Sequence, residues 1–100
     1  MTIGKCTEGN ALTLTLKGRL DTITAKLLEA EISGFDGKEI VILDFAGIEY
    51  VSSAGLRVLL AMQKKMNALR GELRLIRVNA DVNEVFEMTG FSDFLTIELL

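Results

Sequence analysis

The sequence predicts a single α/β domain built on a mixed β-sheet, with helices between the strands. Leu12, Leu14 and Leu16 alternate with polar residues, which is the period of a half-buried strand. Residues 40–43, Ile-Val-Ile-Leu, form a continuous apolar run typical of a strand covered on both faces. Stretches that favour helix separate the later strands, so the expected element order is β-β-α-β-α-β-α-β with right-handed crossovers. A chain of 100 residues suffices for one hydrophobic core but not for two, so residues 1–100 are expected to form one domain.

The chain is expected to begin with a β-hairpin. Residues 2–7 are its first strand and residues 12–17 its second, and Glu8-Gly9-Asn10 is typical of a turn between them. A short turn between neighbouring strands favours antiparallel pairing. Cys6 is the only cysteine and has no partner for a disulfide, so we expect a buried or half-buried apolar side chain there.

A first helix is expected over residues 22–33, capped by Asp21 or Thr22 and stopped by Gly34. Its apolar residues partly alternate as they would in a strand, but its residue types favour a helix. Residues 35–38 then lead to the buried strand. One face of this helix is expected to pack on the sheet, and it consists of Ile23, Leu27 and Ala30. Two further apolar residues lie beside that face, Leu28 and Ile32.

The stretch DFAGIEYVSSAGLRVLL, residues 44–60, is expected to be the junction around which the fold is organised. Asp44 is the first charge after the apolar run, so the buried strand is expected to end there. Ser52 and Ser53 stand where a helix needs a cap for the free N–H groups of its first turn, and Gly55 allows another surface to approach closely. In open α/β sheets, ligands and partners bind at the carboxyl ends of the strands.

A long second helix follows the junction and is expected to end at Gly71. After a further strand, a short helix over residues 80–89 has Asp81 as its expected cap and Gly90 as its stop, and residues 94–99 supply the last strand. The apolar residues expected inside are Leu59, Met62, Met66 and Leu69 of the second helix, Leu73, Leu75, Ile76 and Val78 of the strand, and Val82, Val85 and Phe86 of the short helix.

Composition narrows the functions that this chain can have. The net charge is −3 and the Lys and Arg residues are spread out, which gives no electrostatic reason to bind nucleic acid. No apolar run reaches the roughly 20 residues that span a bilayer, and no signal-peptide pattern is present, so we expect a cytoplasmic protein without direct membrane insertion. Histidine is absent, which removes the usual zinc ligand and the usual general base at neutral pH. A Ser-His-Asp mechanism is therefore excluded, and no catalytic residue, cofactor or metal site is predicted.

No hydrolase or nucleotide-binding motif is complete. Ser53-Ala54-Gly55 matches the second half of a G-x-S-x-G nucleophile elbow, but Val51 stands where its first glycine should be. Neither a G-x-x-x-x-G-K-[ST] loop nor a G-x-G-x-x-G fingerprint is present. Asp21 and Asp44 both follow expected strands and could share a metal, although a helix cap and a loop anchor are the simpler interpretations.

Two interpretations of Ser52 and Ser53 stay open from the residues alone. A serine cap stabilises a helix by about 1 kcal/mol over alanine, and one serine is enough for that purpose. The second hydroxyl, beside the small residues Ala54 and Gly55, would then be free and accessible to a modifying enzyme.

The junction resembles the signature of the STAS domain, a family named from sulfate transporters and anti-sigma factor antagonists. Its motif is an aspartate, an aromatic and an aliphatic residue, two small polar positions, a small residue and Gly-Leu, as in residues 44–56. GRLDTITA, residues 18–25, and MTGFSDFLTI, residues 88–97, resemble two other recurrent blocks of the family. The resemblance implies a STAS-like fold over almost the whole chain, and the stand-alone length is similar to that of the bacterial anti-sigma factor antagonists.

The resemblance also implies a switch. It implies that the unmodified protein binds a GHKL-type serine kinase that is also an anti-sigma factor, and so frees a sigma factor for transcription. The kinase phosphorylates a serine at the start of the second helix, and a PP2C-type phosphatase reverses this. Carried over by position, that serine is Ser53, with Ser52 as a second candidate. The expected partner surface consists of Asp21, Thr24, Ser52, Ser53, Ala54, Gly55 and Leu56.

Functions of other classes stay open beside this one. The chain could be a STAS subunit of a membrane-associated transport complex, where it would clamp another subunit without being phosphorylated. Nucleotide binding at the same crevice is a third possibility. A hydroxyl at the modifiable position, Ser53, favours the first interpretation, a regulatory binding module that is a substrate of a kinase rather than an enzyme.

Overall fold

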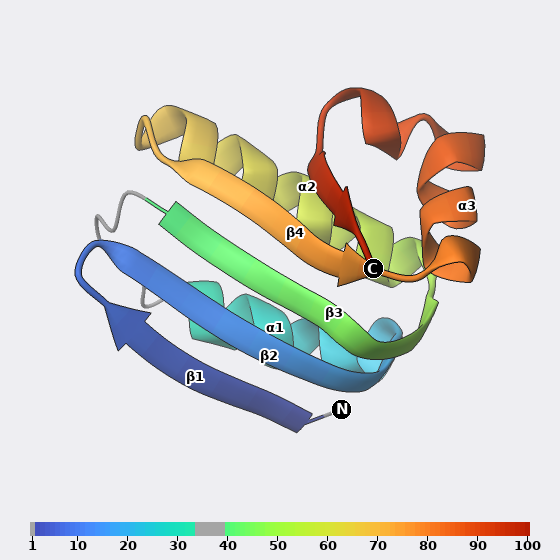
Figure 1. Cartoon of the computed structure of the whole chain (residues 1–100), viewed down its shortest axis with the longest axis horizontal. Coiled ribbons are helices and arrows are strands. Elements are labelled where there is room, and N and C mark those ends of the chain that lie inside the picture. The colour runs from blue at the N-terminus through green and yellow to red at the C-terminus, as the bar shows by residue number, and fades with distance from the viewer. Residues whose placement is uncertain (1, 34–39) are drawn as a thin grey trace.

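Strands and helices alternate along the chain as the sequence predicts (Figure 1). The computed structural model describes residues 2–33 and 40–100, so the expected stop at Gly34 and the connection over residues 35–38 lie outside the described residues. Within them the predicted order is confirmed, with one 3₁₀ turn before the last strand. The elements are β1 (Thr2–Glu8), β2 (Ala11–Leu20), α1 (Thr22–Ser33), β3 (Ile40–Val51), α2 (Ser53–Ala68), β4 (Glu72–Val78), α3 (Ala80–Thr89), η1 (Phe91–Asp93) and β5 (Thr96–Leu99).

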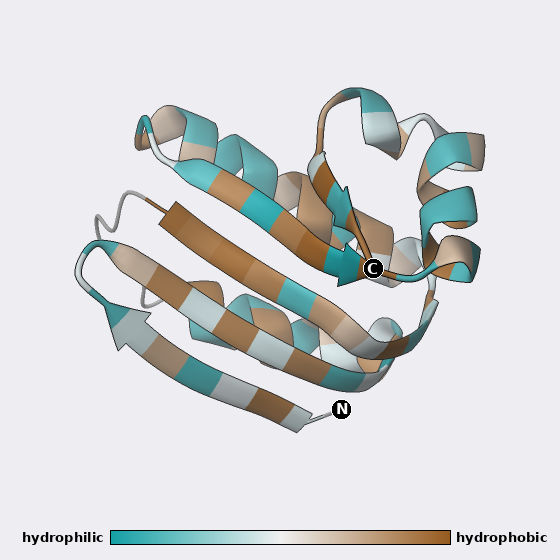
Figure 2. Cartoon of the chain, viewed as in Figure 1, coloured by the Kyte–Doolittle hydropathy of each residue, from teal (hydrophilic) through white to brown (hydrophobic). Residues whose placement is uncertain are grey.

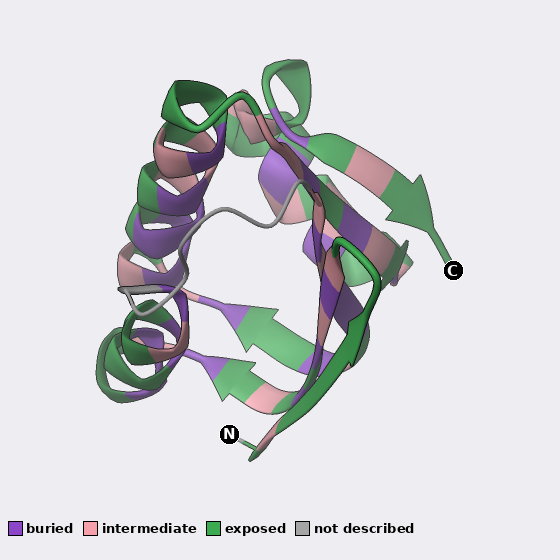
Figure 3. Ribbon diagram, turned by 90° about the vertical axis from the view of Figure 1, so that its left-hand side faces the viewer, coloured by how far each residue is buried: buried purple, intermediate pink, exposed green. Residues whose placement is uncertain are grey.

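The described strands form one mixed sheet in the order β1-β2-β3-β4-β5. β1 and β2 pair antiparallel, from Thr2 opposite Lys17 to Glu8 opposite Ala11, so the expected hairpin is confirmed. The other neighbours pair parallel, and α1 and α2 cover the same face of the sheet (Figures 1 and 3). Because each of these helices follows the carboxyl end of its strand, both begin at the same edge of the sheet.

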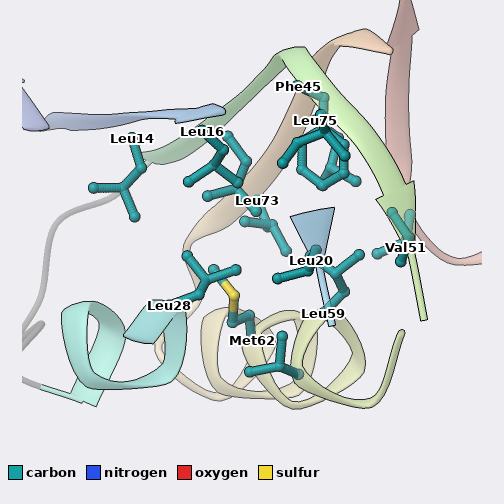
Figure 4. Packing of buried hydrophobic residues seen from close by; sticks show 14 of the residues in the cluster. Leu14, Leu16, Leu20, Leu28, Phe45, Val51, Leu59, Met62, Leu73 and Leu75 are labelled. Carbon is teal, nitrogen blue, oxygen red and sulfur yellow. The ribbon is translucent and has the colours of Figure 1, made fainter. Parts of the chain in front are cut away.

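The core lies between the sheet and the two helices. The alternating leucines of β2 are buried, and Figure 2 shows the alternation along that strand. In Figure 4, Leu14 and Leu16 of β2 lie above Leu28 of α1, and Leu59 and Met62 of α2 pack below the sheet. Each fully buried side chain of this size stabilises the fold by roughly 1.5 to 3 kcal/mol relative to an exposed one.

The sequence-based prediction of the buried face of α1 is wrong. Leu28 and Ile32, which were expected only beside that face, are buried together with Ala25. The residues expected to face the core are exposed instead: Ile23 (77%), Leu27 (50%) and Ala30. Both stripes are apolar, so the periodicity alone does not decide which one meets the sheet.

The start of α1 sets the rotation of the helix. The Thr24 hydroxyl donates a hydrogen bond to the Arg19 carbonyl at 2.6 Å, which ties the first turn to the end of β2. With Thr24 held against the strand, Ala25 and Leu28 turn toward the sheet and Ile23 turns away from it. The two stripes each consist of one Ile, one Leu and one Ala, so a single polar anchor is enough to decide which of them faces the sheet.

β3 does not end at Asp44 as predicted, but continues to Val51. Asp44 is only 5% exposed and lies inside the strand, where the Arg77 side chain donates hydrogen bonds to its carboxylate. The Ala46 N–H donates a further bond to Asp44 Oδ1 at 3.0 Å. Because the charge is paired and hydrogen-bonded, the strand tolerates it, and Asp44 is not the loop anchor that the sequence suggested. Its expected place at the carboxyl end of a strand is likewise wrong.

The C-terminal end of α2 also differs from the prediction. The apolar stripe is buried as far as Met66, but Leu69 is 46% exposed. The helix ends at Ala68, before Gly71, and Leu69 is already the C-terminal cap. The chain turns in the left-handed region at Arg70, with φ of 59°, where glycine would be the commoner residue.

α3 has the predicted bounds but not the predicted cap. The Asn79 side chain, rather than that of Asp81, accepts a backbone N–H of the first turn at 2.9 Å. Gly90 ends the helix as predicted, with φ of 80°. Phe86 faces inward, and its ring centroid lies 6.1 Å from that of Phe45 of β3, which fixes α3 to the sheet.

The second face of the sheet has no helix over it in the described part of the chain (Figure 3). Cys6 lies opposite Thr13 on this face and is exposed, so its predicted burial is wrong. Ile76, in register with Asp44, is half-buried there rather than inside the core. The last strand is shorter than predicted, because the N–H groups of Phe94 and Leu95 donate to the Phe91 carbonyl and close the 3₁₀ turn before the strand begins.

Candidate functional site

Ser52 is the N-terminal cap of α2. Its backbone is extended, with φ of −88° and ψ of 174°, and its Oγ accepts a hydrogen bond from the Gly55 N–H at 3.2 Å. The Ser52 carbonyl accepts from the Leu56 N–H at 2.9 Å, the first bond within the helix. Ser52 is therefore the serine that has the structural role of a helix cap, and its side chain is half-buried.

Ser53 is the first residue of α2 and is exposed. Among the described residues, its hydroxyl takes part in no hydrogen bond, so the cap does not need it. It lies at the positive end of the helix dipole, where unpaired backbone N–H groups favour a negative charge. No acidic residue is present in this first turn to compete for that position.

The backbone beneath Ser53 is fixed by close packing. A Cβ atom at Gly55 would lie 2.8 Å from both the Cγ and the carbonyl oxygen of Leu20, and 3.1 Å from Val51 Cγ1. The Ser52 N–H also donates to the Leu20 carbonyl at 2.8 Å, and Leu56 is only 8% exposed. Gly55 and Leu56 therefore position the start of α2 from below and offer little surface to a partner.

The start of α1 lies beside the start of α2, because Leu20 and Val51, at the ends of β2 and β3, are paired in the sheet. Asp21 Oδ1 accepts the N–H groups of Ile23 and Thr24, both at 3.1 Å, so Asp21 is the cap and the Thr22 alternative is not realised. The hydrogen bond from the Thr24 N–H is the main cause that lowers the pKa of Asp21 from its ordinary value of 3.8.

Thr24 is buried and fully engaged at this corner. Its hydroxyl donates to the Arg19 carbonyl and accepts the Asp21 N–H at 2.8 Å. The Arg19 guanidinium lies 4.4 Å from the centre of the Tyr50 ring and 4.0 Å from Asp21 Oδ2. Of the predicted partner residues, Asp21, Ser52, Ser53 and Ala54 keep accessible surface, whereas Thr24, Gly55 and Leu56 support them from beneath.

The two carboxylates considered as metal ligands, Asp21 and Asp44, do not form a common site. In the described part of the chain, no three His, Cys, Asp or Glu side chains gather where a metal ion could be held. Asp21 and Asp44 each bond to a group of their own, and the hydrogen bond from Arg77 is the main cause that lowers the pKa of Asp44. A carboxylate that stays ionised in this way is a poor general base at neutral pH. None of the described helices is long and apolar enough to cross a membrane.

Sequence reasoning missed two features of the molecule. The first is the pairing of Arg77 with Asp44; β4 holds a second arginine, Arg74, which pairs with Glu72, so the residues alone do not say which arginine meets Asp44. The second is a groove between α1 and α2, lined by Thr22, Ala25, Ala54 and other residues of both helices. The groove could not be predicted because the buried face of α1 was assigned to the wrong stripe.

Comparisons with known proteins agree with this architecture. The sequence profile of the STAS domain family matches residues 4–99. The chain is 41% identical over 78 residues to BtrV of Bordetella bronchiseptica, which is assigned as an anti-sigma factor antagonist; the match covers 76% of this chain and 67% of BtrV.

Solved structures show the same fold. A crystal structure of a protein from Thermotoga maritima, assigned as an anti-sigma factor antagonist, superposes with a TM-score of 0.90 at 18% identity, covering 98% of this chain and 86% of that one. The Bacillus cell fate determinant SpoIIAA in its phosphorylated form superposes with a TM-score of 0.75 at 20% identity, covering 96% of this chain and 90% of that one.

Proposed function

The chain belongs to the STAS domain family, and from this premise we propose that it is an anti-sigma factor antagonist. It binds an anti-sigma factor serine kinase of the GHKL type in the cytoplasm and so frees a sigma factor for transcription. Phosphorylation of Ser53 by that kinase switches the binding off, and a PP2C-type phosphatase restores it. In this account the chain is a binding module and a substrate, not an enzyme.

The exposure of the Ser53 hydroxyl is the observation that carries this proposal. Two serines stand at the start of α2, and the helix uses only Ser52 as its cap. Phosphorylation of Ser52 would remove the bond to the Gly55 N–H and disturb the first turn. Phosphorylation of Ser53 would leave the hydrogen bonds of the described residues intact, which is why we favour Ser53 over Ser52.

A phosphate on Ser53 changes the surface without requiring a change in the fold. It adds about −1.5 to −2 charges at pH 7, at a helix end where the dipole favours an anion. A partner fitted to a small neutral hydroxyl would meet both bulk and charge there. A loss of about 2.8 kcal/mol in binding free energy is enough to weaken the complex about 100-fold.

The expected partner surface surrounds this hydroxyl. Asp21 lies at the start of α1, and Ser52, Ser53 and Ala54 lie at the neighbouring start of α2. The buried residues Thr24, Gly55 and Leu56 keep these groups in fixed positions. A surface that is already rigid loses little conformational entropy when a partner docks.

The proposal is tested with the purified protein, its cognate anti-sigma factor kinase and ATP. We expect one phosphate per chain, located on Ser53 by mass spectrometry, absent in Ser53→Ala and retained in Ser52→Ala. We also expect Ser53→Asp to weaken binding of the kinase at least tenfold, with Ser53→Ala binding as the unmodified protein does. Binding without phosphorylation, unchanged by Ser53→Asp, would instead favour a STAS subunit of a transport complex and would contradict the switch.

A further inference from the structure

α1 and α2 lie side by side with an open groove between them, on the side of the helices that faces away from the sheet. The groove consists of two adjoining hollows of about 270 and 210 Å³, which share Glu29, Val58 and Ala61 in their linings. It runs from Thr22 at the start of α1 to Lys65, whose Nζ donates to the Ile32 carbonyl at 2.9 Å and closes the far end. From Thr22 to Ile32 the helix rises about 15 Å, which is close to three helical turns.

The floor of the groove is apolar and the rims are charged. Ala25 of α1 and Ala54, Val58 and Ala61 of α2 leave the space between the helices unfilled. Lys26 also lines the groove, and the apolar side chains of Ile23 and Leu27 are exposed on the same helix outside the groove lining. Exposed apolar surface near a groove of this kind is typical of an interaction site.

The cations at the rims are free to bind a partner. Lys26 on α1 and Arg57 on α2 line the half of the groove nearest Ser53, and among the described residues neither has an ion-pair partner. By contrast, Lys5, Arg19, Arg74 and Arg77 each lie within 4.0 Å of a carboxylate. In a chain of net charge −3, two unpaired cations facing one another across an apolar floor favour an acidic partner segment.

We propose that this groove receives an amphipathic helix of the anti-sigma factor, whose apolar side chains lie on the alanine and valine floor and whose acidic side chains pair with Lys26 and Arg57. This inference rests on the proposed function and names the second half of the same docking surface. A helix of about three turns matches the length of the groove from Thr22 to Lys65. Glu29, one turn beyond Lys26, directs the acidic residues of the partner toward the Ser53 end.

The groove also connects the phosphate to the loss of binding. Ser53 and Arg57 are four residues apart on α2 and both are exposed, so their side chains are neighbours on the helix surface. A phosphate on Ser53 would pair with the Arg57 guanidinium and remove the cation that the acidic partner needs. Phosphorylation therefore acts at the groove as well as at the hydroxyl itself.

The experiment measures the dissociation constant of the cognate anti-sigma factor kinase for groove variants and matched controls. Lys26→Glu and Arg57→Glu are each expected to weaken binding on the order of tenfold, and the loss should shrink at high salt. Lys64→Glu makes the same change of charge on α2 outside the groove lining and is expected to have a much smaller effect. Ala61→Trp, which fills the floor, should also weaken binding about tenfold, whereas Ala68→Trp at the exposed end of α2 should not. Circular dichroism of each variant checks that the fold is retained.

The outcomes separate this inference from the proposed function. If Ser53→Asp weakens binding but Lys26→Glu, Arg57→Glu and Ala61→Trp match their controls, the groove is not the docking site and the switch stands. If the groove variants weaken binding and Ser53→Asp does not, the groove proposal stands and the switch fails. If the unmodified protein does not bind the kinase, the proposed function fails and the groove proposal falls with it.

Discussion

The starts of α1 and α2 lie side by side at one edge of the sheet, yet they use their polar groups in opposite ways. At α1, the Thr24 hydroxyl makes a hydrogen bond as donor and another as acceptor, and Asp21 Oδ1 accepts two backbone N–H groups. At α2, Ser52 alone provides the cap and the hydroxyl of Ser53 is left over. The group available for regulation is therefore the one that the fold does not need, and its neighbours hold it in place.

The largest effect is expected at Gly55, where α2 touches the end of β2. Gly55→Ala adds a Cβ 2.8 Å from the Leu20 backbone oxygen, so the helix start must shift. We expect the free energy of unfolding in urea to fall by about 1 to 3 kcal/mol. Gly4→Ala is the matched control, because its Cβ would lie 3.6 Å from the nearest atom and should change stability by less than about 0.5 kcal/mol. Equal stability of the two variants would show that the α2 corner is not held by this packing.

The second test removes the anchor of α1. Thr24→Val keeps the shape of the side chain but leaves the Arg19 carbonyl and the Asp21 N–H without their side-chain partner, which is expected to cost about 1 to 3 kcal/mol. Thr22→Val is the control, since Thr22 is exposed and its hydroxyl makes no hydrogen bond in the described part of the chain. A loss of the same size in both variants would contradict the role assigned to Thr24.

The two serines of α2 should differ in the same experiment. Ser52→Ala removes the cap and is expected to lower the free energy of unfolding by about 1 kcal/mol. Ser53→Ala removes a hydroxyl without a partner and should stay within about 0.5 kcal/mol of the unmodified protein. If Ser53→Ala lowered the free energy of unfolding more than Ser52→Ala, the assignment of the cap to Ser52 would be wrong.

The smallest effect is a pH dependence confined to the α1 corner. The pKa of Asp21 is lowered, chiefly by the hydrogen bond from the Thr24 N–H, so its carboxylate stabilises the fold at pH values above about 4. That contribution is lost as the pH falls through the lowered pKa. Asp21→Asn should therefore flatten the acid limb of the curve of unfolding free energy against pH, below about pH 4. The first turn of α2 contains no acidic residue, so Ser52→Ala should leave the shape of that limb unchanged.

Much of the architecture follows from local sequence patterns. The alternating leucines predict β2, although the strand runs over Ala11–Leu20 rather than residues 12–17, and the glycine at position 90 predicts the end of α3, which the structure confirms. The errors occur where a contact distant in sequence decides the outcome. Arg77 lies 33 residues from Asp44, and their pairing allows β3 to continue through a charge that would otherwise end it. The anchor at Thr24 likewise selects one of two equally apolar stripes of α1.

The candidate site was predictable in kind but not in detail. Two adjacent serines before an apolar stripe indicate a helix cap, yet nothing in the residues says which serine supplies it. That choice depends on the extended backbone at Ser52 and on the contact of Gly55 with Leu20. The groove needed the three-dimensional placement of both helices.

The most direct test compares the protein carrying phosphoserine at position 53 with the unmodified protein. The affinity of each for the cognate kinase is measured by titration, and the melting temperature of each is measured by thermal unfolding. The account predicts binding at least tenfold weaker with a melting temperature changed by no more than about 2 °C. Unchanged affinity for the kinase, or a phosphorylated chain that has lost its fold, would contradict the claim that Ser53 is a spare hydroxyl on a rigid corner.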